Sequence, residues 1–135
     1  MKNKILLAGL FCCSLISTEA QVLLDKNAGK NSFPIVSPSA NVVVCFDGKD
    51  ETVVRKSVSL FTDDVRRVTG QDLKAQASNP GEVSARYAII VGTAGKSAWI
   101  DALTAKKKID ITPIAGGWER YMIETVDNPA PGIKK

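Results

Sequence analysis

The chain has 135 residues, of which 44% are hydrophobic and 24% are charged, and its formal net charge is +4. This length corresponds to a single domain with a modest hydrophobic core. There is no histidine, so the commonest transition-metal ligand and the commonest general base near neutral pH are both excluded. The small basic excess forms no stripe interleaved with aromatic residues, and the composition therefore does not indicate a nucleic-acid partner.

The N-terminus has the pattern of a secretory signal peptide. Lys2 and Lys4 form a short basic region, and the apolar stretch Ile5–Ile16 follows. The next residues, Ser17–Ala20, fit a signal-peptidase site with cleavage before Gln21. The apolar stretch is about a dozen residues long, whereas a membrane-spanning helix needs roughly 20. The mature chain is therefore expected to be secreted or periplasmic, without a membrane span.

Two cysteines in the signal region raise lipid attachment as an alternative. Cys12 and Cys13 lie there, but Phe11 occupies a position where lipoprotein processing favours a small residue. Removal of residues 1–20 leaves Cys45 as the single cysteine, so no internal disulfide is expected. Its apolar surroundings predict a buried thiol that behaves as a small hydrophobe.

The first half of the mature chain predicts a strand followed by a helix, after an N-terminal extension at 21–32. The nearly all-apolar run at 42–46 is typical of a strand covered on both faces. A helix is expected over 51–69, with Asp50 accepting a hydrogen bond from its first turn and Gly70 ending it. Its inner face is predicted from apolar residues at intervals of three and four: Val54, Val58, Phe61, Val65 and Val68.

The second half continues the alternation of strands and helices. Turn-forming residues at 77–84 predict a loop before the strongest strand pattern of the chain, at 87–91. A second helix is expected over 96–106, and further strands at 109–114 and 121–126. The chain from 33 to 135 is thus predicted as a small β-α-β-α-β domain of the α/β class with a mixed sheet. The strand at 121–126 leads into a Pro/Gly turn, so the domain is expected to be incomplete at its C-terminus.

A glycine-rich segment after the 87–91 strand contains the parts of a phosphate-binding loop. Gly92-Thr93-Ala94-Gly95-Lys96-Ser97 follows a strand and opens a helix. A P-loop requires a further glycine five residues before Gly95, and that position holds Ile90. A loop counted from Gly92 is two residues too short to surround a triphosphate. The segment is therefore interpreted as a tight strand-to-helix turn, and no nucleotide is expected.

The acidic residues do not form a recognisable catalytic pair. Asp63 and Asp64 are adjacent, so on a helix they point about 100° apart. Asp47 and Asp50 flank a turn, where aspartate is favoured for local hydrogen bonding. A glycosidase needs two carboxylates facing each other across roughly 5 to 10 Å. These residues alone predict no self-sufficient enzyme, and they indicate no cofactor and no metal.

Three segments resemble the N-terminal region of glycoside hydrolase family 115. They are residues 58–70 (VSLFTDDVRRVTG), residues 87–93 (YAIIVGT) and residues 116–121 (GGWERY). The similarity extends from about Phe33 to Lys135, and Gly-Gly-Trp-Glu is its most specific part. Members of this family are xylan α-1,2-glucuronidases, in which a small α/β accessory domain precedes a catalytic (β/α)8 barrel.

The resemblance implies a non-catalytic N-terminal region whose partner is the remainder of the parent hydrolase. The catalytic carboxylates belong to the barrel, so no catalytic residue can be assigned in this chain. Trp118 and Glu119 are the positions implied to lie near the substrate cleft, although packing against the accessory sheet is the favoured interpretation of both. The alternative is a short cell-envelope protein that binds a carbohydrate or a protein partner.

Overall fold

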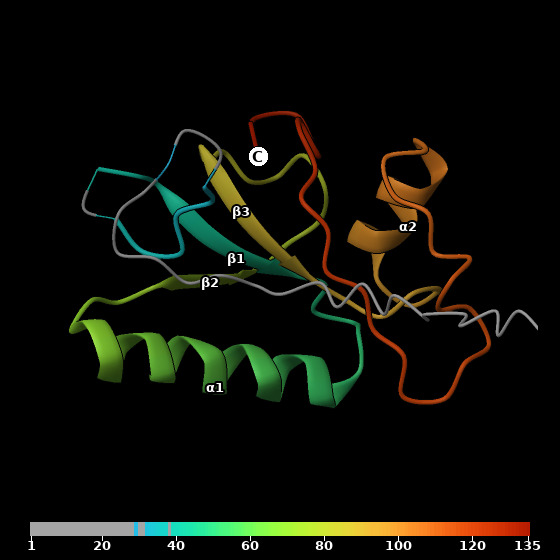
Figure 1. Ribbon diagram of the computed structural model, residues 1–135, viewed down its shortest axis with the longest axis horizontal. Helices are drawn as coiled ribbons and strands as arrows, with labels where there is room; N and C mark the ends of the chain where they lie inside the picture. The colour runs from blue at the N-terminus through green and yellow to red at the C-terminus, as the bar shows by residue number, and fades with distance from the viewer. Residues whose placement is uncertain (1–28, 30–31, 38) are drawn as a thin grey trace, which may run out of the picture.

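The computed structural model describes residue 29, residues 32–37 and residues 39–135. The predicted signal peptide (1–20) lies outside these residues, as does most of the predicted extension at 21–32. The described part is a small α/β domain with three strands and two helices (Figure 1). In chain order they are β1 (Val42–Phe46), α1 (Thr52–Thr69), β2 (Lys74–Ala77), β3 (Tyr87–Val91) and α2 (Ala98–Ala105). The predicted α/β class is confirmed.

The sheet has the strand order β2-β1-β3, and both of its strand pairs are parallel. The predicted mixed sheet is therefore wrong for the described strands. β1 lies in the centre because it pairs with both other strands, and four of its five residues are buried there. Its side chains alternate between two hydrophobic clusters, with Val43 and Cys45 in one and Val42 and Val44 in the other. The strand predicted from an all-apolar run is thus covered on both faces.

Helix α1 covers the sheet face that carries Val42 and Val44. Val54 and Val58 are its buried residues, and Phe61 and Val65 pack at the margin of the same cluster. Gly70 ends the helix in the left-handed conformation with φ 71°, and its N–H donates to the carbonyl of Arg66 at 2.8 Å.

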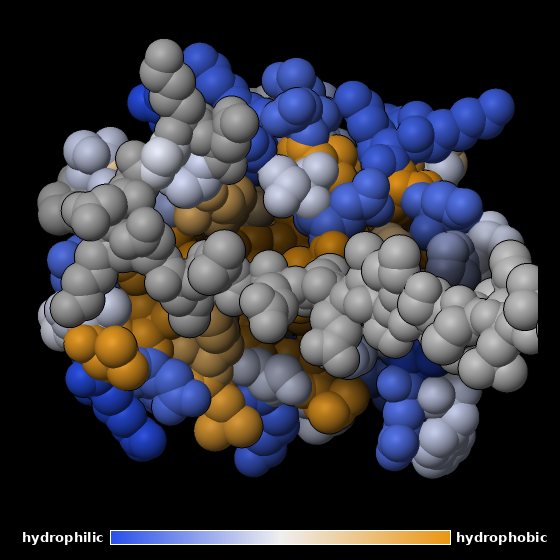
Figure 2. Space-filling model, in the orientation of Figure 1, coloured by the Kyte–Doolittle hydropathy of each residue, from blue (hydrophilic) through white to orange (hydrophobic). Residues whose placement is uncertain are grey.

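The prediction that Val68 belongs to the inner face of α1 is wrong. The side chain of Val68 is 85% exposed. At 100° per residue it lies roughly 80° around the helix from Val58, the most deeply buried residue of α1. Val53 and Leu60 are also exposed, at 66% and 64%. Figure 2 shows apolar side chains at the surface over α1.

Helix α2 and the C-terminal segment cover the opposite face of the sheet. Trp99 and Leu103 are the buried residues of α2. The indole of Trp99 is 1% exposed, and its Nε1–H donates to the carbonyl of Ser78 at 2.7 Å. The helix begins at Ala98, two residues later than predicted, because Lys96 belongs to the preceding turn and Ser97 is the N-cap.

In the remaining chain two predicted strands are wrong, and one observed strand was not predicted. β2 was not predicted, because the sequence Lys-Ala-Gln-Ala is polar and becomes a strand only by pairing with β1. The segments 109–114 and 121–126 are not strands. For 121–126 the reason is that a different segment, Gly132–Lys135, occupies the start of the outer edge of β3.

Gly132–Lys135 runs parallel to the chain that leads into β3. The N–H of Ala85 donates to the carbonyl of Gly132 at 3.1 Å, and the N–H of Ala88 donates to the carbonyl of Lys135 at 2.8 Å. Ile133 is 3% exposed and belongs to the same cluster as Trp99. Figure 1 shows the C-terminal stretch (red) ending beside β3.

No helix in the described part of the chain is long and apolar enough to cross a membrane.

Candidate functional site

The turn between β3 and α2 lies at the carboxyl edge of the parallel sheet, where α/β proteins commonly bind ligands. Its backbone amides are already hydrogen-bonded to carboxylates of this chain. The N–H of Thr93 donates to Asp50 Oδ2 at 2.8 Å, and the N–H of Ala98 donates to Asp47 Oδ2 at 2.9 Å. The N–H of Gly95 donates to an oxygen of the third carboxylate, Asp101, at 3.1 Å. In a P-loop, backbone N–H groups of this turn would bind phosphate, but here they donate to these three carboxylates. The negative charge of the carboxylates also disfavours a bound phosphate.

Asp47 and Asp50 connect the end of β1 to this turn. Their exposed fractions are only 7% and 5%. Hydrogen bonds from the backbone N–H groups of Ala98 and then Lys49 hold the pKa of Asp47 below its ordinary value. Both carboxylates therefore hold the β3–α2 turn against the end of β1. The sequence predicted local hydrogen bonds for them, which the N–H groups of Lys49 and Glu51 donate, but not these long-range ones.

Lys96, the lysine of the P-loop-like sequence, pairs with a carboxylate as well. Its ammonium forms an ion pair with Glu51, the N-cap residue of α1, and this partner raises the pKa of Lys96. The pair lies at the surface, since both side chains are about half exposed. Lys96 thus links α1 to the β3–α2 turn.

Gly92 is required by packing. A Cβ at this position would overlap Ser97 Oγ, and it would lie 2.6 Å from Ser97 Cβ and 2.9 Å from Ile100 Cγ1. Ser97 is fully buried, and within the described residues its Oγ has no hydrogen-bond partner. The resemblance of this segment to a phosphate loop therefore reflects the close approach of β3 to the start of α2.

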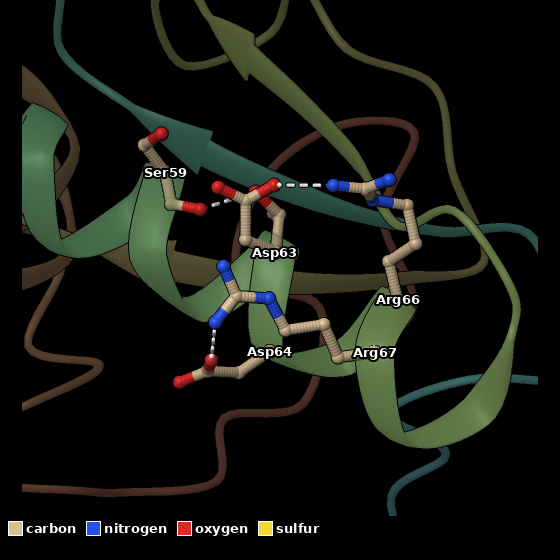
Figure 3. Close-up of polar contacts among 6 residues, drawn as sticks. Ser59, Asp63, Asp64, Arg66 and Arg67 are labelled. Atoms are coloured by element: carbon tan, nitrogen blue, oxygen red, sulfur yellow. Dashed lines mark hydrogen bonds and ion pairs between the residues drawn. The ribbon is translucent and has the colours of Figure 1, made fainter.

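The carboxylates of the two adjacent aspartates of α1 point in different directions, as predicted. Asp63 pairs with Arg66 at 3.2 Å and Asp64 pairs with Arg67 at 3.8 Å, each one turn along the helix. Figure 3 shows the two carboxylates directed to different arginines. All four side chains are at least 45% exposed, so these are surface ion pairs that contribute little to stability.

Trp118 and Glu119 lie on a turn that follows α2. The indole of Trp118 is 87% exposed, which contradicts the expectation that it packs against the sheet. Glu119 adopts a positive φ of 53°. The side chain of the next residue, Arg120, packs against Gly117, and its Nη1–H donates to the carbonyl of Pro113 at 3.2 Å.

Two large side chains that follow this turn in the sequence are also exposed. Tyr121 is 82% exposed and Ile123 is 76% exposed. The sequence predicted both in a strand at 121–126, and the apolar run that indicated this strand gave no sign of their exposure. Trp118 and Tyr121 therefore each present an exposed aromatic ring that can stack on a sugar face or contact a protein.

Other chemistry-bearing groups of the described chain are dispersed. No three His, Cys, Asp or Glu residues in the described ranges lie close enough together to hold a metal ion. Cys45 is fully buried, as predicted, and burial raises the pKa of its thiol to about 11.

No protein-family model matches the chain, and no curated protein matches it.

Proposed function

We propose that this chain is the N-terminal, non-catalytic accessory region of a secreted enzyme related to glycoside hydrolase family 115. In this proposal the parent enzyme is a xylan α-1,2-glucuronidase, and glucuronoxylan is reached through its catalytic barrel. The accessory domain is the partner of that barrel and performs no hydrolysis by itself.

The observation that carries a non-catalytic role is the use of the carboxylates. The two most buried ones, Asp47 and Asp50, accept hydrogen bonds from backbone amides and so hold the β3–α2 turn. Asp63 and Asp64 pair with neighbouring arginines. Glycoside hydrolysis needs one carboxylate that can donate a proton and a second facing it, and groups engaged in this way supply neither.

The family is supported by the residues that resemble it and by their distribution over the domain. The segment 58–70 covers most of α1, and 87–93 covers β3 and the start of the following turn. The segment 116–121 forms the turn that carries Trp118. An exposed tryptophan on such a turn suits a contact with the remainder of the hydrolase or with its substrate.

The alternative proposal is a short cell-envelope protein that binds a carbohydrate directly. It is favoured by the exposed aromatic rings of Trp118 and Tyr121. Export by the N-terminal signal sequence is part of both proposals.

Two measurements on the purified mature chain separate these proposals. The first is release of glucuronic acid from glucuronoxylan fragments, and we expect no release above the buffer control. The second is titration with the same fragments by isothermal calorimetry, in the natural chain and in Trp118→Ala. Saturable binding that Trp118→Ala abolishes would favour the carbohydrate-binding alternative, and measurable hydrolysis would overturn the non-catalytic role.

The family itself is tested by the coding sequence beyond the Lys135 codon. A reading frame that continues into an apolar strand and a region of barrel length supports the proposal. A stop codon directly after Lys135 would overturn it for this gene product.

A further inference from the structure

The segment 118–126 has few contacts with the rest of the domain. It carries the exposed side chains of Trp118, Tyr121 and Ile123, and none of its residues belongs to either hydrophobic cluster. Within the described residues, no backbone hydrogen bond joins it to another segment. Figure 1 shows this part of the chain, between α2 and the C-terminal stretch, looping away from the sheet. Core packing and backbone pairing therefore do not fix the direction in which Trp118 points.

One side chain ties this segment to the chain before it. The Nη1–H of Arg120 donates to the carbonyl of Pro113 at 3.2 Å. In the described part of the chain, this is the one hydrogen bond that links 118–126 to another segment. Hydrogen bonds from a charged donor are roughly twice as strong as those between neutral groups. The bond joins the two ends of the turn 113–120, and Trp118 lies between these ends.

Gly117 provides the space that the side chain of Arg120 occupies. A Cβ at Gly117 would overlap Arg120 Cδ and Nε, and it would lie 2.8 Å from Arg120 Cζ. Gly117 is not among the glycines with a positive φ, so the glycine is required here for space and not for its backbone conformation. A larger residue at 117 would displace the guanidinium from the carbonyl of Pro113.

Glu119, between Trp118 and Arg120, has an unfavourable backbone conformation. Its φ is 53°, in the left-handed region that residues with a Cβ rarely adopt. Such a conformation persists where the surrounding contacts hold it. At this turn the contact is made by the next residue, because Arg120 packs against Gly117 and bonds to Pro113.

We infer that Arg120 is a positioning residue for Trp118. By bonding to Pro113 across Gly117, it fixes the turn 113–120 and holds the indole of Trp118 outward in one orientation. This inference rests on the proposed role of Trp118 as a contact with the remainder of the hydrolase or with its substrate. A contact residue that is fixed before binding loses less conformational entropy when its partner arrives, so Arg120 strengthens the contact without touching the partner.

The test is ¹⁵N relaxation measured by NMR on the labelled chain without any partner. We expect an order parameter of about 0.85 for the backbone N–H of Trp118 in the natural chain, and a fall below about 0.6 in Arg120→Ala and in Gly117→Ala. Arg120→Lys keeps a charged donor on a flexible stem, so its value should lie between these two. The melting temperature of Arg120→Ala should change by less than about 4 °C, since Arg120 is exposed and outside both clusters.

Two controls restrict the effect to this turn. The backbone N–H of Trp99, in the buried part of α2, should keep its order parameter in every variant. Arg67→Ala removes an exposed arginine that pairs only with Asp64 at 3.8 Å, and it should leave Trp118 unchanged. A flexible Trp118 in the natural chain, an unchanged value in Arg120→Ala or Gly117→Ala, or an equal loss at Trp99 would each overturn the inference.

This measurement is separate from the tests of the proposed function. A rigid turn in a chain whose reading frame stops after Lys135 would contradict the enzyme family and not the role of Arg120. A flexible turn in a chain whose frame continues into a barrel would contradict the role of Arg120 and leave the family unaffected.

Discussion

Trp99 and Trp118 are the same residue type in opposite environments. The indole of Trp99 is 1% exposed and donates a hydrogen bond to Ser78, whereas that of Trp118 is 87% exposed. We expect Trp99→Ala to lower the free energy of unfolding by about 3 to 5 kcal/mol, because it leaves a cavity and an unpaired carbonyl. Urea denaturation followed by circular dichroism measures this change.

Trp118→Ala is the matched control for that substitution. Its expected effect on the free energy of unfolding is within about 0.5 kcal/mol, since the side chain makes little contact in the domain. A loss as large as that of Trp99→Ala would mean that Trp118 is packed in solution. Emission spectra give an independent measure, because only the exposed indole should be quenched readily by acrylamide.

Asp47 makes stability depend on pH in a defined direction. Hydrogen bonds from the amides of Ala98 and Lys49 lower its pKa in the folded chain below the ordinary value of 3.8. The folded state therefore favours the ionised carboxylate, and this contribution is present above about pH 4 and is lost as the pH falls through the folded pKa. We expect Asp47→Asn to be less stable near neutral pH and to show a smaller loss of stability between pH 4 and pH 2.

Urea midpoints measured at several pH values test the role of Asp47. Asp64→Asn is the control, because its exposed carboxylate only pairs with Arg67 at 3.8 Å. If both variants kept the natural pH dependence, the carboxylate of Asp47 would not be the group responsible.

At the scale of elements, the β3–α2 turn depends on a glycine because two elements approach closely there. A Cβ at Gly92 would lie 2.6 Å from Ser97 Cβ, so we expect Gly92→Ala to destabilise the domain by about 1 to 3 kcal/mol through overpacking. Gly48→Ala is the control, because its added Cβ would meet only Ala77 Cβ at the ordinary distance of 3.6 Å. Thermal unfolding of the two variants should differ clearly, and equal melting temperatures would contradict the packing argument.

The helices and strands also differ in how well the local sequence pattern predicts them. β1 and β3 are apolar throughout, and α1 has a long helical repeat with Gly70 at its end, so these three were predicted near their observed limits. β2 is polar and is a strand only because β1 pairs with it. Residues 121–126 have the opposite property: their composition favours a strand, but among the described residues no neighbouring backbone pairs with them.

At the scale of the whole molecule, the rate at which a reagent labels the Cys45 thiol measures how often the central strand opens. It is fully buried, and burial raises the pKa of its thiol to about 11. At pH 8 the thiolate is then about one part in a thousand, roughly a hundredfold less than for a free thiol. In a Cys12→Ser, Cys13→Ser variant we expect labelling of Cys45 to be slow in buffer and to follow the urea unfolding transition.

Fast labelling of Cys45 in buffer without urea would contradict this expectation. It would mean that β1 opens locally, although strands and helices cover it on both sides. The control is the same variant in denaturing urea, where labelling should be complete at once.

The sequence by itself determined the α/β class, the central apolar strand, the buried Cys45 and the local hydrogen bonds at the turn of Asp47 and Asp50. These follow from periodicity, from turn chemistry and from charge spacing, which act over a few residues. Only the tertiary structure decided the strand order, the parallel pairing of β2, the exposure of Trp118 and the hydrogen bonds that join Asp47 and Asp50 to the β3–α2 turn. Each of these depends on which backbone or side chain lies opposite, and such contacts join residues that are far apart along the chain.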